Sequence, residues 1–159
     1  MQTSSAAAPT VALEVVPVST EPFVRYAEGD QDVIAIHKFL LQYAKDAMLC
    51  PVDHGKSARE VWRVCNENVG LMAFCGGELV GSLGLMEATW WYGDGSFLTD
   101  RWHFVRPDFF HTGVNRVIED EAKKIASAAG LQFIHQGKIR GEKSGILRMR
   151  PRIYLPESA

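Results

Sequence analysis

Two apolar segments separated by a pair of glycines form the clearest pattern along the chain. Residues 69–75 and 78–87 are rich in strand-forming apolar residues, and Gly76-Gly77 lies between them. Glycine pairs tolerate the positive φ angles of a two-residue turn, so this pattern predicts a β-hairpin. A third strand is predicted over residues 96–105, after a turn at residues 93–95. The three strands are expected to form an antiparallel meander.

Three other segments repeat their apolar residues at helical spacing. A helix is predicted over residues 32–48, after a short strand at residues 23–26 and a turn at residues 29–32. A second helix is predicted to begin at Ser57, because Ser57 and Glu60 have the spacing of a capping box. A third runs from about residue 113 to Gly130, and another strand begins at Gln132. Since this helix connects two strands, the strands ending at Val105 and beginning at Gln132 are predicted to be parallel neighbours.

The composition is that of an ordinary globular domain, with 47% hydrophobic and 23% charged residues in a chain of 159. Residues 21–159 are predicted to form one domain, and residues 1–20, which contain Pro9 and Pro17, a flexible N-terminal tail. No apolar run approaches the roughly 20 residues that cross a bilayer. The first basic residue is Arg25, which is late for a secretory signal. A cytoplasmic location without a membrane partner is therefore predicted.

Charge and cysteine content narrow the classes of partner. The formal net charge of -2 argues against nucleic acid as a general partner. Residues 138–152 nevertheless carry six basic residues and one acidic residue, which is compatible either with a solvated loop or with a surface facing phosphates. Cys50, Cys65 and Cys75 lack C-x-x-C spacing, so they are interpreted as reduced, mostly buried thiols, and no metal is predicted.

The order of these elements and two short stretches resemble the GNAT acyltransferase superfamily. Residues 77–81, Gly-Glu-Leu-Val-Gly, are similar to the second strand of the family's hairpin. Residues 105–116 align without a gap on the family's strand end, proline and R/Q-x-x-G-x-G/A loop. Gly113 keeps the motif residue, whereas Phe110 stands in place of Arg or Gln. His111 stands where Gly is frequent, and Asn115 where Gly or Ala is usual.

The resemblance implies an α/β (α+β) fold with a mixed, largely antiparallel sheet, a central parallel strand pair and flanking helices. It also implies an N-acyltransferase that moves an acetyl or other acyl group from acetyl-CoA to an amine of a small molecule or peptide. Backbone N–H groups and the dipole at a helix N-terminus attract an anionic pyrophosphate. In the family, the strand before the loop splays from the next parallel strand, and the cofactor lies in the gap between them. The residues implied to bind the cofactor are Phe104, Val105, Phe110, His111, Thr112, Gly113, Val114, Asn115 and Arg116, with Phe133, Ile134 and His135 on the strand across this gap.

Acyl transfer to an amine needs a base for the ammonium and an acid for the departing thiolate. The candidate bases are Glu87, Asp100 and His103, on strands that the resemblance places beside the acceptor. Tyr154 is the candidate acid, since family members often carry a tyrosine after the fifth strand. Residues such as the three candidate bases are more often solvated or structural groups, and Tyr154 is also compatible with packing in a last strand.

Trp90, Trp91 and Tyr92 form an aromatic cluster that could line an acceptor pocket, pack in the core or make a homodimer contact. Two other functions stay open. Phe110, His111 and Asn115 favour a degenerate ligand-sensing or protein-binding module without catalysis. The basic run at residues 138–152 favours a member directed to nucleic acid.

Overall fold

The computed structural model describes residues 6–9, 20–48 and 50–135, and the backbone of residues 152–154. In this part of the chain six strands form one sheet in the order β1-β2-β3-β4-β5-β6. Neighbouring strands are antiparallel except for β4 and β5, which are parallel. The strands are β1 (Phe23–Tyr26), β2 (Val69–Cys75), β3 (Glu78–Thr89), β4 (Ser96–Val105), β5 (Gln132–His135) and β6 (Arg152–Tyr154).

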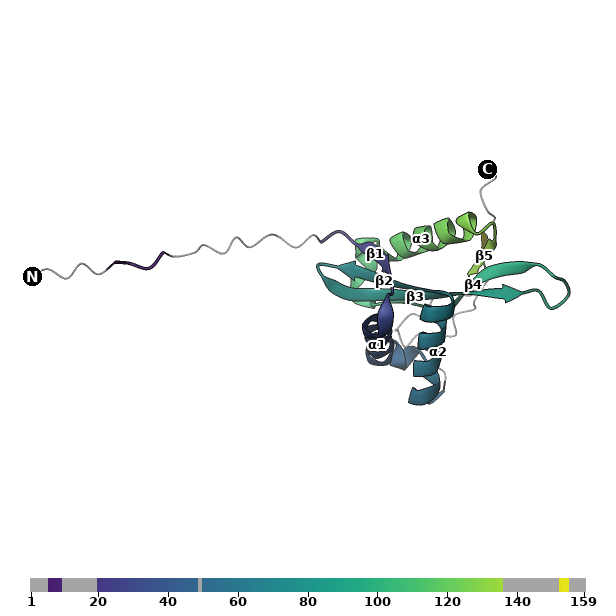
Figure 1. Cartoon of the computed structure of the whole chain (residues 1–159), viewed down its shortest axis with the longest axis horizontal. Coiled ribbons are helices and arrows are strands. Elements are labelled where there is room, and N and C mark those ends of the chain that lie inside the picture. Colours follow the sequence, from purple (N-terminus) through teal and green to yellow (C-terminus); the bar gives the residue numbers. More distant parts are fainter. Residues whose placement is uncertain (1–5, 10–19, 49, 136–151, 155–159) are drawn as a thin grey trace, which may run out of the picture.

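Helices cover both faces of the sheet (Figure 1). The helix α3 lies on one face, and α1 and α2 lie on the other. This arrangement confirms the predicted mixed sheet with flanking helices. The helical segments are α1 (Gly29–Phe39), a π-helical turn η1 (Leu40–Ala44), the 3₁₀ turn η2 (Lys45–Ala47), α2 (His54–Glu67), the 3₁₀ helix η3 (Pro107–Thr112) and α3 (Val114–Ala128).

The hairpin and the parallel strand pair are confirmed. Gly76 and Gly77 adopt φ angles of 61° and 78°, as the two-residue turn requires. The strand predicted over residues 96–105 coincides with β4. Leu98 on β4 lies opposite Phe133 on β5, so α3 connects two parallel neighbours as predicted.

The starts of the first two helices differ from the prediction. The first begins at Gly29, and its last two turns are π-helical and 3₁₀. The second begins at His54, because the Asp53 side chain accepts the N–H of Lys56 and caps the helix there. The predicted capping box at Ser57 is therefore wrong. The Ser57 hydroxyl instead donates to the His54 carbonyl, and Glu60 pairs with arginines.

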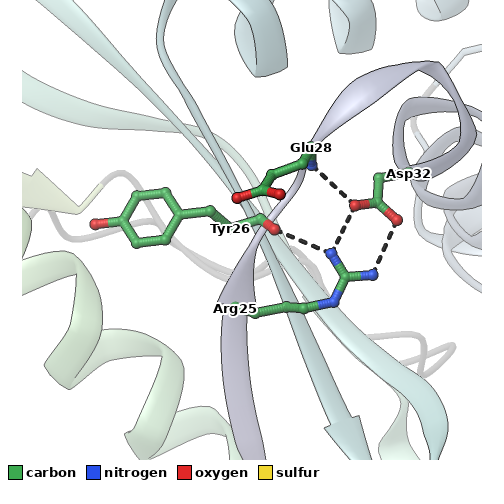
Figure 2. A network of polar contacts seen from close by, with 4 residues as sticks. All are labelled: Arg25, Tyr26, Glu28 and Asp32. Atoms are coloured by element: carbon green, nitrogen blue, oxygen red, sulfur yellow. Dashed lines mark hydrogen bonds and ion pairs between the residues drawn. The ribbon is translucent and has the colours of Figure 1, made fainter.

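An exposed ion pair joins the edge strand β1 to the start of α1 (Figure 2). Arg25 donates to both carboxylate oxygens of Asp32, at 2.6 and 2.9 Å. Asp32 also accepts the backbone N–H of Glu28 at 2.8 Å, and Arg25 donates to the Tyr26 carbonyl at 3.0 Å. The Arg25 guanidinium holds the pKa of the Asp32 carboxyl below its ordinary value. The network fixes the direction in which the chain leaves β1.

Two apolar cores lie on opposite faces of the sheet. The core under α3 contains Leu83, Leu85, Leu98, Val105, Val114, Ile118, Ala122 and Phe133, among others. The core under α1 and α2 contains Ile36, Phe39, Val61, Val64, Met72, Trp102 and Phe104, among others. Burial of this kind supplies most of the driving force for folding.

The three thiols are free, as predicted, but Cys50 is exposed. Burial raises the pKa of the Cys65 thiol to about 11. Among the helices of the described residues, none combines the length and apolar character that crossing a bilayer requires. Most of the predicted N-terminal tail and of the basic run at residues 138–152 lies outside the described residues.

Candidate functional site

A β-bulge in the middle of β4 decides which side chains share a face. Gly84 of β3 lies opposite Trp102, but the next residue, Leu85, lies opposite Asp100, so Arg101 is the extra residue. Side chains alternate between the faces of a strand, and one inserted residue inverts that alternation. Asp100 and His103 therefore both lie on the α3 face with Leu98 and Val105. The Arg101 side chain pairs with Glu60 of α2 at 2.8 Å.

The bulge brings three buried polar side chains together with β5. Asp100, His103 and His135 are 6%, 1% and 3% exposed. His135 Nδ1 lies 2.8 Å from Asp100 Oδ2, and the rings of His103 and His135 have centroids 5.0 Å apart. Glu119, on the helix α3 that covers this face, lies nearby, with its Oε1 3.8 Å from His135 Nε2. We call Asp100, His103, His135 and Glu119 the polar cluster.

The connection from β4 to α3 contains the predicted cofactor loop. Residues Pro107–Thr112 form the 3₁₀ helix η3, and Gly113, with φ of 79°, joins it to α3. Arg116 and Val117 donate their N–H groups to the Gly113 carbonyl, and the Val114 N–H donates to Thr112 Oγ1 at 3.4 Å. The N–H of Asn115 comes before the first residue that can donate to a carbonyl within the helix. A Cβ built on Gly113 meets no heavy atom within 4 Å. The backbone at the start of α3 is therefore open to an approaching group.

Arg106 anchors the start of this connection. Its guanidinium pairs with Glu78 at the start of β3 and with Asp108 at 2.8 Å. The same group lies over the rings of Tyr43 and Phe109, 4.4 and 4.9 Å from their centroids. Because both carboxylates neutralise it, Arg106 contributes little positive potential to the loop.

The residues predicted to bind the cofactor fall into two groups. Phe104 and Val105 are buried in opposite cores, and Val114, the first residue of α3, is buried against the sheet, so these three could offer only backbone groups to a ligand. Phe110, His111, Gly113 and Arg116 are exposed, and Thr112 and Asn115 are partly so. The Arg116 side chain is 88% exposed and has a distant ion pair, 3.9 Å, with Asp120. Thr112 Oγ1 donates to the Phe109 carbonyl at 2.6 Å.

The predicted catalytic residues do not come together. Asp100 and His103 belong to the polar cluster and lie beside His135. From the sequence, His135 was predicted only as a residue near the cofactor and not as a partner of these two. Glu87 is exposed on β3 opposite Leu98, and its N–H is bound by Asn68. Tyr154 lies on β6 opposite Phe133, with only its backbone described. No sequence motif links Asp100 to His135, because a bulge in β4 and the crossover through α3 bring them together.

The aromatic cluster lies in the connection between β3 and β4. Trp90 stacks against Tyr92 and packs on Phe97, with centroids 5.6 and 4.3 Å apart. Trp91 and Tyr92 are 92% and 67% exposed. Trp90 therefore has a packing role, while Trp91 and Tyr92 project from the end of the sheet.

Solved structures match this arrangement although sequence comparisons do not. No protein-family model matches the chain, and no curated protein matches its sequence. A GNAT family acetyltransferase from Staphylococcus aureus superposes with a TM-score of 0.55 over 79% of this chain and 94% of its own, at 12% identity. The chain has the GNAT fold.

Two further GNAT-fold neighbours are acetyltransferases with different named acceptors. A ribosomal-protein-alanine N-acetyltransferase from Brucella melitensis matches with a TM-score of 0.56 and 15% identity, over 75% of this chain and 80% of its own. An aminoglycoside acetyltransferase from an uncultured soil metagenomic sample, in complex with sisomicin, matches at 0.54 and 14%, over 74% and 78%. Identities this low establish the fold alone.

Proposed function

We propose that this protein is an acetyl-CoA-dependent N-acyltransferase that acylates an amine of a small molecule or peptide. One observation carries the proposal: in a GNAT fold, the connection after β4 leads through Gly113, which has a left-handed conformation, to an N-terminus of α3 whose backbone is open. An anion at this position would meet the N–H groups of the first turn of α3 and the positive end of the helix dipole.

The described residues fit such a ligand in part. Gly113 leaves the backbone open, and the exposed Arg116 offers a guanidinium in the first turn of α3. Phe110 contributes no charge. The β4 ladder to β5 covers Phe97 to Thr99, and β4 continues for six residues beyond it, toward the loop. We propose that Phe104 and Val105 offer their backbone groups to the extended arm of the cofactor there.

Acetyl-CoA, when bound, supplies the acyl group as a reactive thioester. The chain must bind its phosphates, orient the thioester and remove a proton from the acceptor amine. Glu87 and Tyr154 remain our proposals for proton transfer. Glu87 is exposed to solvent and can exchange protons with water directly, whereas Asp100, another of the candidate bases, is buried against His135.

Gly113 and Gly130 provide a matched test of the binding site. Both have positive φ, 79° and 67°, and neither has a heavy atom within 4 Å of an added Cβ. Gly113→Val and Gly130→Val should each lose about 1–2 kcal/mol of stability from the left-handed conformation. Only Gly113→Val should weaken acetyl-CoA binding, by about tenfold or more, equivalent to about 1.4 kcal/mol, in calorimetric titrations. A folded Gly113→Val protein with wild-type affinity would place the phosphates elsewhere.

Catalysis and acceptor class need a separate assay. Thiol release from acetyl-CoA is followed in the presence of sisomicin or of a peptide with an N-terminal alanine, and the acylated product is identified by mass spectrometry. Amine-dependent release with either acceptor supports the proposal and assigns the acceptor class. Acetyl-CoA binding without any amine-dependent release across a broader amine panel would reject catalysis.

The second candidate function is a ligand-sensing or protein-binding module that has lost catalysis. It is favoured by Phe110, where the family motif supplies Arg or Gln, and by Arg106, whose charge is neutralised by Glu78 and Asp108. Phe110 is 39% exposed, so an arginine there could reach a phosphate without disturbing the core. No binding by the wild type, together with binding by Phe110→Arg, would favour this module over the enzyme.

A further inference from the structure

The polar cluster has the composition and convergence of a metal site. Asp100, His103 and His135 each offer one ligand atom, and these atoms all lie within 4.8 Å of one another. All three residues are nearly inaccessible to solvent. Buried charged and polar groups are costly unless they are paired or coordinate a metal. A surface cluster of acidic groups would carry no such implication.

The fold itself produces the convergence. The bulge at Arg101 places Asp100 and His103 on one face of β4, three residues apart, where regular alternation would separate them. The parallel register, with Thr99 opposite Ile134, places His135 beside Asp100. Two adjacent strands and one irregularity thus supply the three donor side chains.

We propose that Asp100, His103 and His135 bind one divalent transition-metal ion of the Zn²⁺ class. Two imidazoles and one carboxylate suit Zn²⁺, Co²⁺ or Ni²⁺, whereas Mg²⁺ and Ca²⁺ prefer oxygen ligands. Ligand atoms around tetrahedral zinc lie about 3.3 Å apart, given metal–nitrogen distances near 2.0 Å. The 2.8 Å separation of Asp100 Oδ2 from His135 Nδ1 and the 4.8 Å limit for the set bracket that spacing.

Glu119 has the position of an outer partner. Histidine ligands usually donate their second ring N–H to a carboxylate, which fixes the tautomer and orientation of the ring. If Nδ1 of His135 binds the metal, Nε2 is the second ring nitrogen, and it lies 3.8 Å from Glu119 Oε1, which a small shift of the Glu119 side chain would bring into hydrogen-bond range. Three protein ligands leave a fourth position of a tetrahedral ion for water or another group. In this proposal Asp100 is a metal ligand and not the base of acyl transfer.

Cobalt and zinc binding to the full-length, tag-free protein test the site directly. Chelator-stripped protein is titrated with Co²⁺, followed by its visible absorption, and with Zn²⁺ by equilibrium dialysis and elemental analysis. The wild type should bind one ion per chain, and zinc should displace cobalt. No stoichiometric ion bound at micromolar protein would overturn the proposal. Neither measurement uses acyl-CoA, so its outcome is independent of the proposed function.

A graded set of variants separates this site from adventitious binding. Asp100→Asn, His103→Ala and His135→Ala should weaken zinc binding at least 100-fold, and Glu119→Gln about 10–100-fold. His54→Ala is the matched control, because His54 is exposed and outside the polar cluster. It should bind zinc as the wild type does. Two outcomes would overturn the assignment. One is an equal loss of zinc affinity in His54→Ala, and the other is an unchanged zinc affinity in Glu119→Gln and in every ligand variant that folds.

Discussion

The two faces of β4 differ in how their side chains are satisfied. On the α1 and α2 face, Trp102 and Phe104 pack into an apolar core. The Trp102 indole donates to Ser82, whose hydroxyl donates to the Leu71 carbonyl, both at 2.9 Å. The ring fits because Gly84 lies opposite it, where a Cβ would approach to 2.5 Å. Packing and these hydrogen bonds account for the side chains described on the α1 and α2 face.

On the α3 face the same strand carries Asp100 and His103 among aliphatic side chains. Apolar residues of similar volume would fill this space without the cost of burying a carboxylate. Polar residues buried beside an apolar core that is already complete indicate a functional role rather than a packing role. This contrast is the reason for assigning a metal site to the α3 face. Two predictions test that contrast, and a third compares it with an exposed ion pair, in decreasing order of expected effect.

Removing the tryptophan of the apolar face should have the largest effect on stability. Trp102→Ala deletes a side chain that is 7% exposed and should lower the free energy of unfolding by about 3–5 kcal/mol in urea titrations. Trp62→Ala is the control, since Trp62 is 47% exposed on α2, and should cost less than about 1 kcal/mol. Similar losses in both variants would show that this face is not a packed core.

The polar face should respond differently to paired substitution. In metal-free protein, Asp100→Leu or His135→Leu alone leaves the other buried polar group without its 2.8 Å partner, and each should cost about 1–3 kcal/mol. The double variant should return to within about 1 kcal/mol of wild type, because apolar replacement of a buried pair is often neutral. Urea unfolding of the four proteins gives the coupling energy. Additive losses would mean that the pair stabilises the fold as the apolar core does.

The exposed pair of Arg25 and Asp32 gives the smallest effect and a defined pH dependence. Asp32→Asn should cost about 0.5–1 kcal/mol at neutral pH, since the pair lies at the surface, with the Arg25 side chain 44% exposed. The pKa of Asp32 is lowered in the folded state, so its contribution is complete above the unfolded pKa of about 3.9 and is lost as the pH falls through the folded value. The stability difference from wild type should therefore shrink below about pH 4.

Asp30→Asn is the control for this prediction, because Asp30 is exposed in the same first turn of α1. It shares the favourable interaction with the helix dipole but not the contact with Arg25. A difference that persists unchanged into acid in Asp32→Asn, or an equal response in Asp30→Asn, would contradict the assigned role of the pair.

Local patterns predicted much of this fold. The Gly76-Gly77 turn, the limits of β4 and the parallel neighbour beyond α3 follow from residues close in sequence. The capping box at Ser57 failed because Asp53, four residues earlier, offered a competing cap that begins the helix sooner.

The site depended on features without a local signature. Regular alternation would place Asp100 on the face of Trp102 and away from His103, and the bulge at Arg101 reverses this. Glu119 joins them only through the packing of α3 on the sheet. The loop motif, by contrast, was visible in the sequence through Gly113 and Pro107, although its 3₁₀ conformation was not.

The Arg106 anchor has a consequence for ligand affinity. By pairing with Glu78 on β3 and lying over the ring of Tyr43, it holds the chain that leads to Gly113 against two other parts of the domain, and its pair with Asp108 braces η3 itself. A segment held in this way has already lost conformational entropy on folding, so a ligand at the start of α3 does not have to order it. The entropic cost of binding there is reduced before any contact with the ligand forms.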